Sequence, residues 1–382
     1  MMDSIYMATI FTMKNYCLVS LALSASMIVH GGGAHAADIA AQCRADLEDT
    51  RAFITANDAG ASALLADHGP AITRAYDTAL AATASDAGSC LGLLTAYLRA
   101  WRPGHLAILR APQDSIVPPS AAHPASQAKA DMRAPRLQAL DKNTLLLTLP
   151  TFSEAYRSIL QAFLSGQRGV LQSHRNWIID VRDNDGGSDA TFQPLLAWLL
   201  DGELRTHATE FFVTPANIQA QEDVCAFVSD KAACKQMVAP IVAAMRTVQP
   251  GSFVSAGGQS MLVQAVPPEP MRPSRVAVLI DTPCGSSCEQ FVLEARTGAR
   301  VKVLGRPTQG VVDVSNLRPH RLPSGRILFY ATTRSTRLPA MRIDGIGIAP
   351  DILLPTPKDQ AARDAEVAQV QRWLEGGSLG TQ

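Results

Sequence analysis

Four short apolar runs between residues 145 and 304 constrain the fold more than any other feature. Stretches with a helical pattern separate these runs. Runs of four to six apolar residues that alternate with helices are typical of strands buried on both faces of a sheet. The sequence therefore predicts an α/β layer built on these strands, which are Leu145 to Leu149, Trp177 to Val181, Val276 to Ile280 and Val301 to Leu304.

The composition agrees with a folded protein and excludes several classes. Apolar residues make up 47% of the 382 residues and charged residues 18%, so the chain can bury a large core. Lys plus Arg and Asp plus Glu number 34 each. The chain therefore has no excess of basic residues to form the positive surface that nucleic-acid binding requires. We expect no nucleic-acid partner. No period and no second long apolar run occurs, which excludes collagen, coiled coils and multi-span membrane proteins.

Residues 1–36 have the pattern of a secretory signal peptide. Lys14 precedes an apolar stretch over 17–29, and the small-residue sequence AHA follows at 34–36. The apolar stretch is shorter than the roughly 20 residues that a membrane span needs, although an uncleaved anchor is the alternative. We predict an exported protein, periplasmic or secreted, that begins near Ala37 and has no membrane span after cleavage.

Six cysteines remain once the signal peptide is removed, and an even number fits disulfides in an oxidising compartment. Sequence alone does not choose among the many pairings that six cysteines allow. A zinc site is the alternative, but the paired C-x-x-C spacing of such sites is missing and we expect no metal. We favour local pairing, of Cys43 with Cys90, Cys225 with Cys234, and Cys284 with Cys288.

The mature chain is expected to have four parts. Residues 37–110 are rich in Ala and Leu with few β-branched residues, which predicts an N-terminal helical domain. Residues 111–140 contain five prolines among Ala, Ser and Gln, which is typical of a surface linker. The α/β domain follows over 141–357, with an insertion at about 208–274 that packs on the core. Residues 358–382 are expected to form a helix that docks on this domain and a tail.

The segment from Val276 to Val303, VAVLIDTPCGSSCEQFVLEARTGARVKV, carries the strongest chemical signal. A buried strand leads into a short turn, and Ser286 and Ser287 open a helix. A serine at such an elbow exposes its hydroxyl, while the N–H groups and positive end of the helix stabilise an oxyanion. Ser286 is therefore a candidate nucleophile. The alternative is that one of the two serines only caps the helix.

A second segment, NWIIDVRDNDGGSD at 176–189, is a buried strand that ends in a Gly186-Gly187 turn. Adjacent glycines let the backbone approach a ligand closely and supply N–H donors at positive φ. The alternative is a simple tight turn. The two segments together suggest a site at the ends of two buried strands.

Four blocks of the chain, in order, resemble one peptidase family. Residues 145–152 resemble its "YIRIPSF" strand, and IIDVRDNDGG resembles its "LIIDLRGNGGG". CGSSCEQFVLEARTGARVKVLGRPTQG is similar to "SASASEIFAGALKDNGRATLVGEPTFGKG", and RLPSGRILFYATT with IDGIGIAPDI is similar to "LPSG" and "EGKGVEPDI". These are motifs of the C-terminal-processing and tricorn-core serine peptidases, or tail-specific proteases, and the resemblance covers roughly 90–356. It implies a ClpP/crotonase-like catalytic core, protein or peptide substrates, and no metal or organic cofactor.

The resemblance also suggests which residues act. In the Ser–Lys branch of the family a lysine follows the serine, but alignment on Glu289 puts Val311 there, and valine cannot act as a base. The sequence is more similar to the tricorn-like branch, which uses a serine, a histidine and an acid. These roles fall to Ser286, His105 and Asp344. Serine becomes nucleophilic when an imidazole takes its proton and an acid orients that imidazole.

The same resemblance implies an oxyanion hole made of the backbone N–H of Ser287 and one from Gly186 or Gly187. His320 is a competing base, and Asp344 precedes a glycine and is equally typical of a turn. Fewer than forty residues separate His105 from the first strand, too few for a PDZ domain, so C-terminal recognition is not inferred.

We therefore predict an exported serine endopeptidase without a PDZ domain. The alternative is a catalytically inactive ligand- or peptide-binding protein on the same fold, because a fold does not determine function. An acyl-CoA enzyme of the crotonase type fits poorly with export and paired cysteines. The oligomeric state, the peptide specificity and the physiological substrate stay open.

Overall fold

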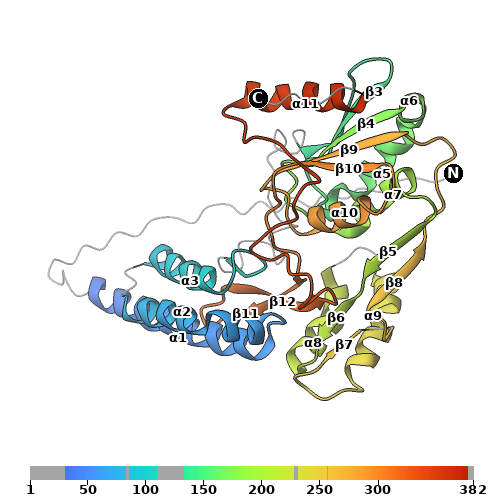
Figure 1. Ribbon diagram of the computed structural model, residues 1–382. Helices are drawn as coiled ribbons and strands as arrows, with labels where there is room; N and C mark the ends of the chain where they lie inside the picture. The colour runs from blue at the N-terminus through green and yellow to red at the C-terminus, as the bar shows by residue number, and fades with distance from the viewer. Residues whose placement is uncertain (1–30, 83–85, 110–132, 228–230, 256, 377–382) are drawn as a thin grey trace, which may run out of the picture.

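In the computed structural model, the described residues form two larger sheets, a two-stranded ribbon and the helices around them (Figure 1). The structure describes residues 31–82, 86–109, 133–227, 231–255 and 257–376. Most of the predicted signal peptide and most of the predicted linker lie outside these residues.

The first sheet contains the four predicted apolar runs. Its strand order is β13-β10-β9-β4-β3-β2, and neighbouring strands are parallel except β2 and β3. Parallel neighbours place the carboxyl ends of β4 and β9 at one edge of the sheet, where ligand-binding loops typically gather. The strands are β2 (Arg136–Ala139), β3 (Thr144–Thr148), β4 (Asn176–Asp180), β9 (Arg275–Ile280), β10 (Val301–Gly305) and β13 (Ile352–Leu353).

Both faces of this sheet are covered, which explains why its strands are continuously apolar (Figure 1). Successive residues of β4 point to opposite faces: Trp177 packs with Phe291 in one core, and Ile178 packs with Val370 in another. The predicted α/β fold is confirmed. One face carries η1 (Glu154–Tyr156), α5 (Arg157–Gly166), α6 (Arg168–Ser173), α7 (Asp189–Leu199) and α10 (Ser287–Ala295), and the other α11 (Gln360–Leu374).

The second sheet joins segments that lie far apart in the sequence. Its central strand β12 (Ile327–Ser335) is antiparallel to β1 (Ala107–Leu109), β11 (Val314–Arg321) and β6 (Thr209–Phe212), and β6 pairs with β7 (Phe253–Val254). The predicted N-terminal helices are α1 (Gly31–Asn57), α2 (Ala61–Ala81) and α3 (Ala87–Trp101). They share one apolar core with Leu328 and Tyr330 of β12.

The predicted insertion at 208–274 forms a lobe on the second sheet (Figure 1). It begins with β6 and continues through α8 (Pro215–Asp223), η2 (Val224–Phe227), α9 (Lys231–Met245) and β7. Its last strand, β8 (Met261–Ala265), pairs with β5 (Glu203–His207) in the two-stranded ribbon. The lobe therefore extends the second sheet, whereas we expected it to pack on the α/β core.

One boundary is corrected by the structure. Residues 136–139 lie within the predicted linker, but they form β2 and pair with β3 at the edge of the first sheet. The strand is short and largely exposed, so it lacks the apolar pattern by which the other strands were recognised.

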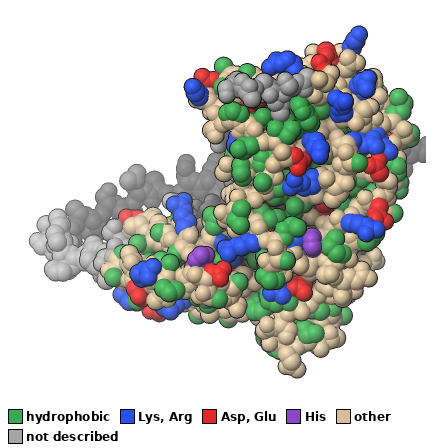
Figure 2. Space-filling view, in the orientation of Figure 1, with side chains coloured by type: hydrophobic (Ala, Val, Ile, Leu, Met, Phe, Trp, Pro, Cys, Tyr) green, Lys and Arg blue, Asp and Glu red, His purple; other side chains and the backbone are tan. Residues whose placement is uncertain are grey.

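Three disulfides join the cysteine pairs that the sequence analysis favoured. The sulfur atoms lie 2.12 Å apart in Cys43–Cys90, 1.99 Å in Cys225–Cys234 and 2.04 Å in Cys284–Cys288. All six cysteines are thereby used, which removes them as zinc ligands. None of the helices in the described residues is long and apolar enough to cross a bilayer. Acidic, basic and apolar side chains are interspersed on the face shown in Figure 2.

Candidate active site

The structure brings His105 and Ser286 together, although 181 residues separate them. The Nε2 atom of His105 lies 3.0 Å from Oγ of Ser286, which is a hydrogen-bond distance. His105 follows α3 in the loop that leads to β1, and Ser286 lies between β9 and α10. The site therefore forms where the second sheet meets the carboxyl edge of the first.

Ser286 has the strained backbone of an elbow. Its φ is 56°, a left-handed conformation that non-glycine residues rarely adopt, and its N–H donates to Oε2 of Glu289 at 3.1 Å. The disulfide between Cys284 and Cys288 spans this serine, and both cysteines are fully buried. The covalent bridge and the bond to Glu289 hold the elbow from both sides.

Glu289 organises the loop that faces the elbow. Its fully buried carboxyl group accepts hydrogen bonds from the Thr308 hydroxyl at 2.5 Å and from the N–H groups of Gly310 and Val311 at 2.7 and 2.9 Å. Burial raises the pKa of Glu289, while these bonds and the bond from Ser286 oppose that shift. The sequence analysis used Glu289 only for alignment and missed this role.

Val311, which the sequence analysis aligned with the lysine of the Ser–Lys branch, packs against the loop that carries His105. A Cβ atom added at Gly104 would lie 2.5 Å from Cγ1 of Val311. An aliphatic side chain and a glycine therefore meet at this point, where no lysine amine is available to act as a base.

His105 is oriented by a backbone carbonyl. Its Nδ1 atom contacts the carbonyl oxygen of Val314, which can only accept, so Nδ1 carries the proton and Nε2 has its lone pair toward Ser286. Burial lowers the pKa of His105 to about 4, the bond to Val314 opposes this shift, and the positive charge of Arg102 adds to it. The imidazole is neutral at physiological pH and can accept a proton.

Asp344 lies in the same region but is not bonded to the histidine. Its carboxyl group accepts the N–H of Asp313 at 2.7 Å, and within the described residues it shares no hydrogen bond with His105. Burial raises the pKa of Asp344 to about 7. The negative charge of Glu289 adds to this shift, and the positive charge of Arg102 opposes it. The carbonyl of Val314 thus occupies the position at Nδ1 that a triad assigns to the acid.

The glycine turn touches the elbow. A Cβ atom at Gly186 would lie 2.9 Å from Cβ of Ser286 and 3.0 Å from the nitrogen of Ser287, so only glycine fits there. The N–H of Gly186 donates to Asn184 at 2.9 Å. In the part of the chain that the structure describes, no protein acceptor takes the N–H of Gly187 or Ser287. Of the two glycines considered, Gly187 is therefore the one with an available donor.

Other titratable groups surround the site. Burial raises the pKa of Asp189, the first residue of α7, whose carboxyl group also contacts the Ser287 hydroxyl. Burial likewise raises the pKa of Glu294 in α10 to about 7. The sequence analysis missed both carboxyl groups because neither stands out in a motif. The competing base, His320, is bonded to Asp49 at 2.7 Å and so is engaged elsewhere.

A family model described as peptidase family S41 matches residues 143–354, more than half of the chain. The chain belongs to peptidase family S41. The predicted family is thereby confirmed, and the protein is a serine peptidase that acts on protein or peptide substrates. The matched range includes Ser286, the glycine turn and Asp344, whereas His105 lies outside it.

Solved structures agree with this fold at low identity. A CPAF point mutant has a TM-score of 0.63 at 10% identity, covering 90% of this S41 chain and 99% of its own. Mature CPAF complexed with lactacystin has a TM-score of 0.56 at 13% identity, covering 88% and 97%. A candidate peptidase from Parabacteroides merdae has a TM-score of 0.53 at 14% identity, covering 87% and 96%. No curated protein matches the chain.

Proposed function

We propose that this S41 peptidase is an exported serine endopeptidase that hydrolyses peptide bonds through an acyl-enzyme on Ser286, with His105 as general base. The observation that carries the proposal is the 3.0 Å distance between Nε2 of His105 and Oγ of Ser286. A serine becomes a strong nucleophile only when such a base can take its proton.

The proposed reaction has two stages. Nε2 of His105 takes the hydroxyl proton while Oγ of Ser286 attacks the peptide carbonyl. The N–H groups of Ser287 and Gly187 stabilise the resulting oxyanion, and each such donor is typically worth about 3–4 kcal/mol. The protonated imidazole then gives its proton to the leaving amine. Water, activated by the same histidine, attacks the acyl-enzyme and releases Ser286.

The base is proposed to be held by two different groups. The Val314 carbonyl accepts the Nδ1 proton and so keeps the tautomer that leaves Nε2 free. Asp344 is proposed to supply negative charge that stabilises the protonated imidazole without a hydrogen bond. Its half-buried position beside the site, together with its raised pKa, supports this role.

Two independent observations, the signal-peptide pattern and the disulfides, support export. Residues 1–36 have the composition of a signal peptide, and three disulfides require an oxidising compartment in which to form and persist. A periplasmic or secreted location satisfies both observations.

Labelling with a fluorophosphonate tests the proposal, because this probe reacts only with an activated serine. The oxidised, folded wild type should be labelled on Ser286, and Ser286→Ala and His105→Ala should abolish labelling. His320→Ala is the matched control, since its histidine is bonded to Asp49, and it should label as the wild type does. A folded wild type that takes no label would overturn the proposal and favour a peptide-binding protein on the same fold.

A further inference from the structure

A buried ion pair reaches from the helical domain to the candidate base. Asp58 lies in the turn between α1 and α2, and Arg102 follows α3. Two parallel bonds of 2.6 Å join the guanidinium to the carboxylate, and the side chains are 4% and 0% exposed. The carboxylate also accepts the N–H of Gly60 at 2.9 Å and that of Ala331 in β12 at 3.0 Å. Asp58 is thereby anchored to both the helices and the second sheet.

Arg102 uses two further donors on the loop that carries His105. Its Nε–H donates to the carbonyl of Gly104 and its Nη2–H to the carbonyl of His105, both at 2.9 Å. A guanidinium is a planar fork that can make all of these bonds in one orientation, which the single ammonium group of lysine cannot. The position of the loop is therefore tied to the position of Asp58.

The loop needs such a restraint. His105 has a φ of 57°, and a non-glycine residue stays in this conformation only where surrounding contacts impose it. The bonds from Arg102 act on the two peptide carbonyls at the point of the turn. The bond from Nδ1 to Val314 then sets the ring, and the bond from Nε2 reaches Ser286.

We infer that Asp58 and Arg102 are positioning residues of the peptidase, which hold the His105 loop so that its imidazole meets Ser286. The inference rests on the proposed function, because it assumes that His105 is the base. It makes the helical domain a working part of the active site, since Asp58 comes from a turn between two of its helices.

Arg102→Lys is the direct test because it keeps the positive charge but loses the fork. We expect the maximal rate of fluorophosphonate labelling to fall about 10- to 100-fold, as is typical when a catalytic group is misplaced by about 1 Å. The probe concentration that gives half of that rate should change little. The matched control is Arg326→Lys, because Arg326 forms a second buried pair with the helical domain, at 2.8 Å from Asp46 of α1. It should label at the wild-type rate.

Gly60→Ala is a second variant that removes no charge. A Cβ atom there would lie 2.9 Å from Nη1 of Arg102 and would displace the guanidinium. Labelling should slow as it does in Arg102→Lys, whereas Gly92→Ala, where the added atom meets nothing within 4 Å, should have no effect. This pair decides the question if Arg102→Lys does not fold.

Spectroscopy separates positioning from a merely structural role. In NMR spectra of protein labelled with ¹⁵N-histidine, His105 should be protonated at Nδ1 in the wild type and in Arg326→Lys. In Gly60→Ala and Arg102→Lys, the His105 signals should show a mixture of the two tautomers. Equal labelling rates and the same tautomer in Arg102→Lys and Arg326→Lys would overturn the inference. A wild type without labelling would instead overturn the proposed function.

Discussion

At the scale of the residue, backbone conformation marks the candidate pair as clearly as chemistry does. Among the described residues, three that are not glycine have a positive φ, and two of these are His105 and Ser286. Strained conformations persist where the surrounding structure imposes them, and they are frequent at active sites. Here the restraints are a disulfide and Glu289 at the serine, and Arg102 and Val314 at the histidine.

The role proposed for Asp344 predicts a particular pH profile. The wild-type labelling rate should rise near pH 4, where His105 loses its proton, and again near pH 7, where Asp344 becomes negatively charged. Asp344→Asn carries no charge and should lose only the upper step. Above pH 7 its rate should be roughly 10-fold lower than that of the wild type, the effect of about 1.4 kcal/mol. Labelling rates measured from about pH 4 to pH 9 test this, and an upper step retained in the Asn variant would exclude the role.

At the scale of the element, the C-terminal helix stabilises the loops of the site from the opposite face of the sheet. Glu366 of α11 accepts hydrogen bonds from Arg182 at 2.7 Å and from Arg306. These arginines follow β4 and β10. They lie close in sequence to the glycine turn and to the residues that donate hydrogen bonds to Glu289. The side chains of all three residues are at most 7% exposed. The helix is thus linked by charge to the edge of the sheet where the site lies.

Glu366→Ala should therefore destabilise the protein strongly. It leaves two buried arginines without a shared partner, and breaking a buried ion pair in this way typically costs about 3–5 kcal/mol. Urea unfolding of the oxidised protein measures this change in the free energy of unfolding. Asp364→Asn alters an exposed residue of the same helix and should stay within about 0.5 kcal/mol of the wild type. Equal effects of the two substitutions would contradict the importance of the network.

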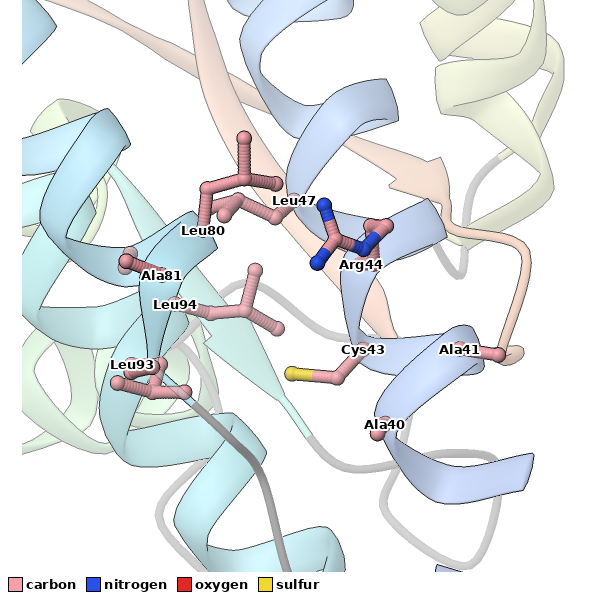
Figure 3. A pocket seen from close by; sticks show the side chains of 11 residues that line it. Ala40, Ala41, Cys43, Arg44, Leu47, Leu80, Ala81, Leu93 and Leu94 are labelled. Atoms are coloured by element: carbon pink, nitrogen blue, oxygen red, sulfur yellow. The ribbon is translucent and has the colours of Figure 1, made fainter. Parts of the chain in front are cut away.

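At the scale of the whole molecule, the N-terminal helices and the second sheet share one apolar core. The core of α1, α2 and α3 is closed by Leu328 and Tyr330 of β12 and by Leu322, which follows β11. A small cavity of about 160 Å³ lies between these helices beside Cys43 and Leu94 (Figure 3). No residue of the candidate site lines this cavity.

This shared core predicts that the helices do not unfold alone. Leu328→Ala removes a fully buried side chain and should lower the free energy of unfolding by about 2–5 kcal/mol. Circular dichroism and tryptophan fluorescence should report the same shifted transition. Leu353→Ala, at a side chain 70% exposed, should have little effect. Two separate transitions, of which only the helical one shifts, would show that the helices are an independent domain.

Many features of this protein could be predicted from local sequence. The apolar runs predicted the strands of the first sheet because burial on both faces leaves a continuous signal. The elbow at Ser286 was recognisable because a strand, a turn and a helix N-terminus are consecutive in the chain, and close spacing favoured two of the three disulfides. The predicted end of the linker was wrong because the strand β2 is short and exposed and so has no apolar pattern.

The tertiary structure alone decided how the base is held. Sequence similarity suggested an acid for His105, but the group at Nδ1 is the carbonyl of Val314, and every residue has a carbonyl, so no side-chain pattern could indicate it. The pair of Asp58 and Arg102 was equally hidden, because 44 residues separate its members and neither belongs to a motif. Sequence determines which groups a chain carries and its local conformations. Which distant carbonyl or carboxylate meets a given side chain depends on how the sheets and helices pack.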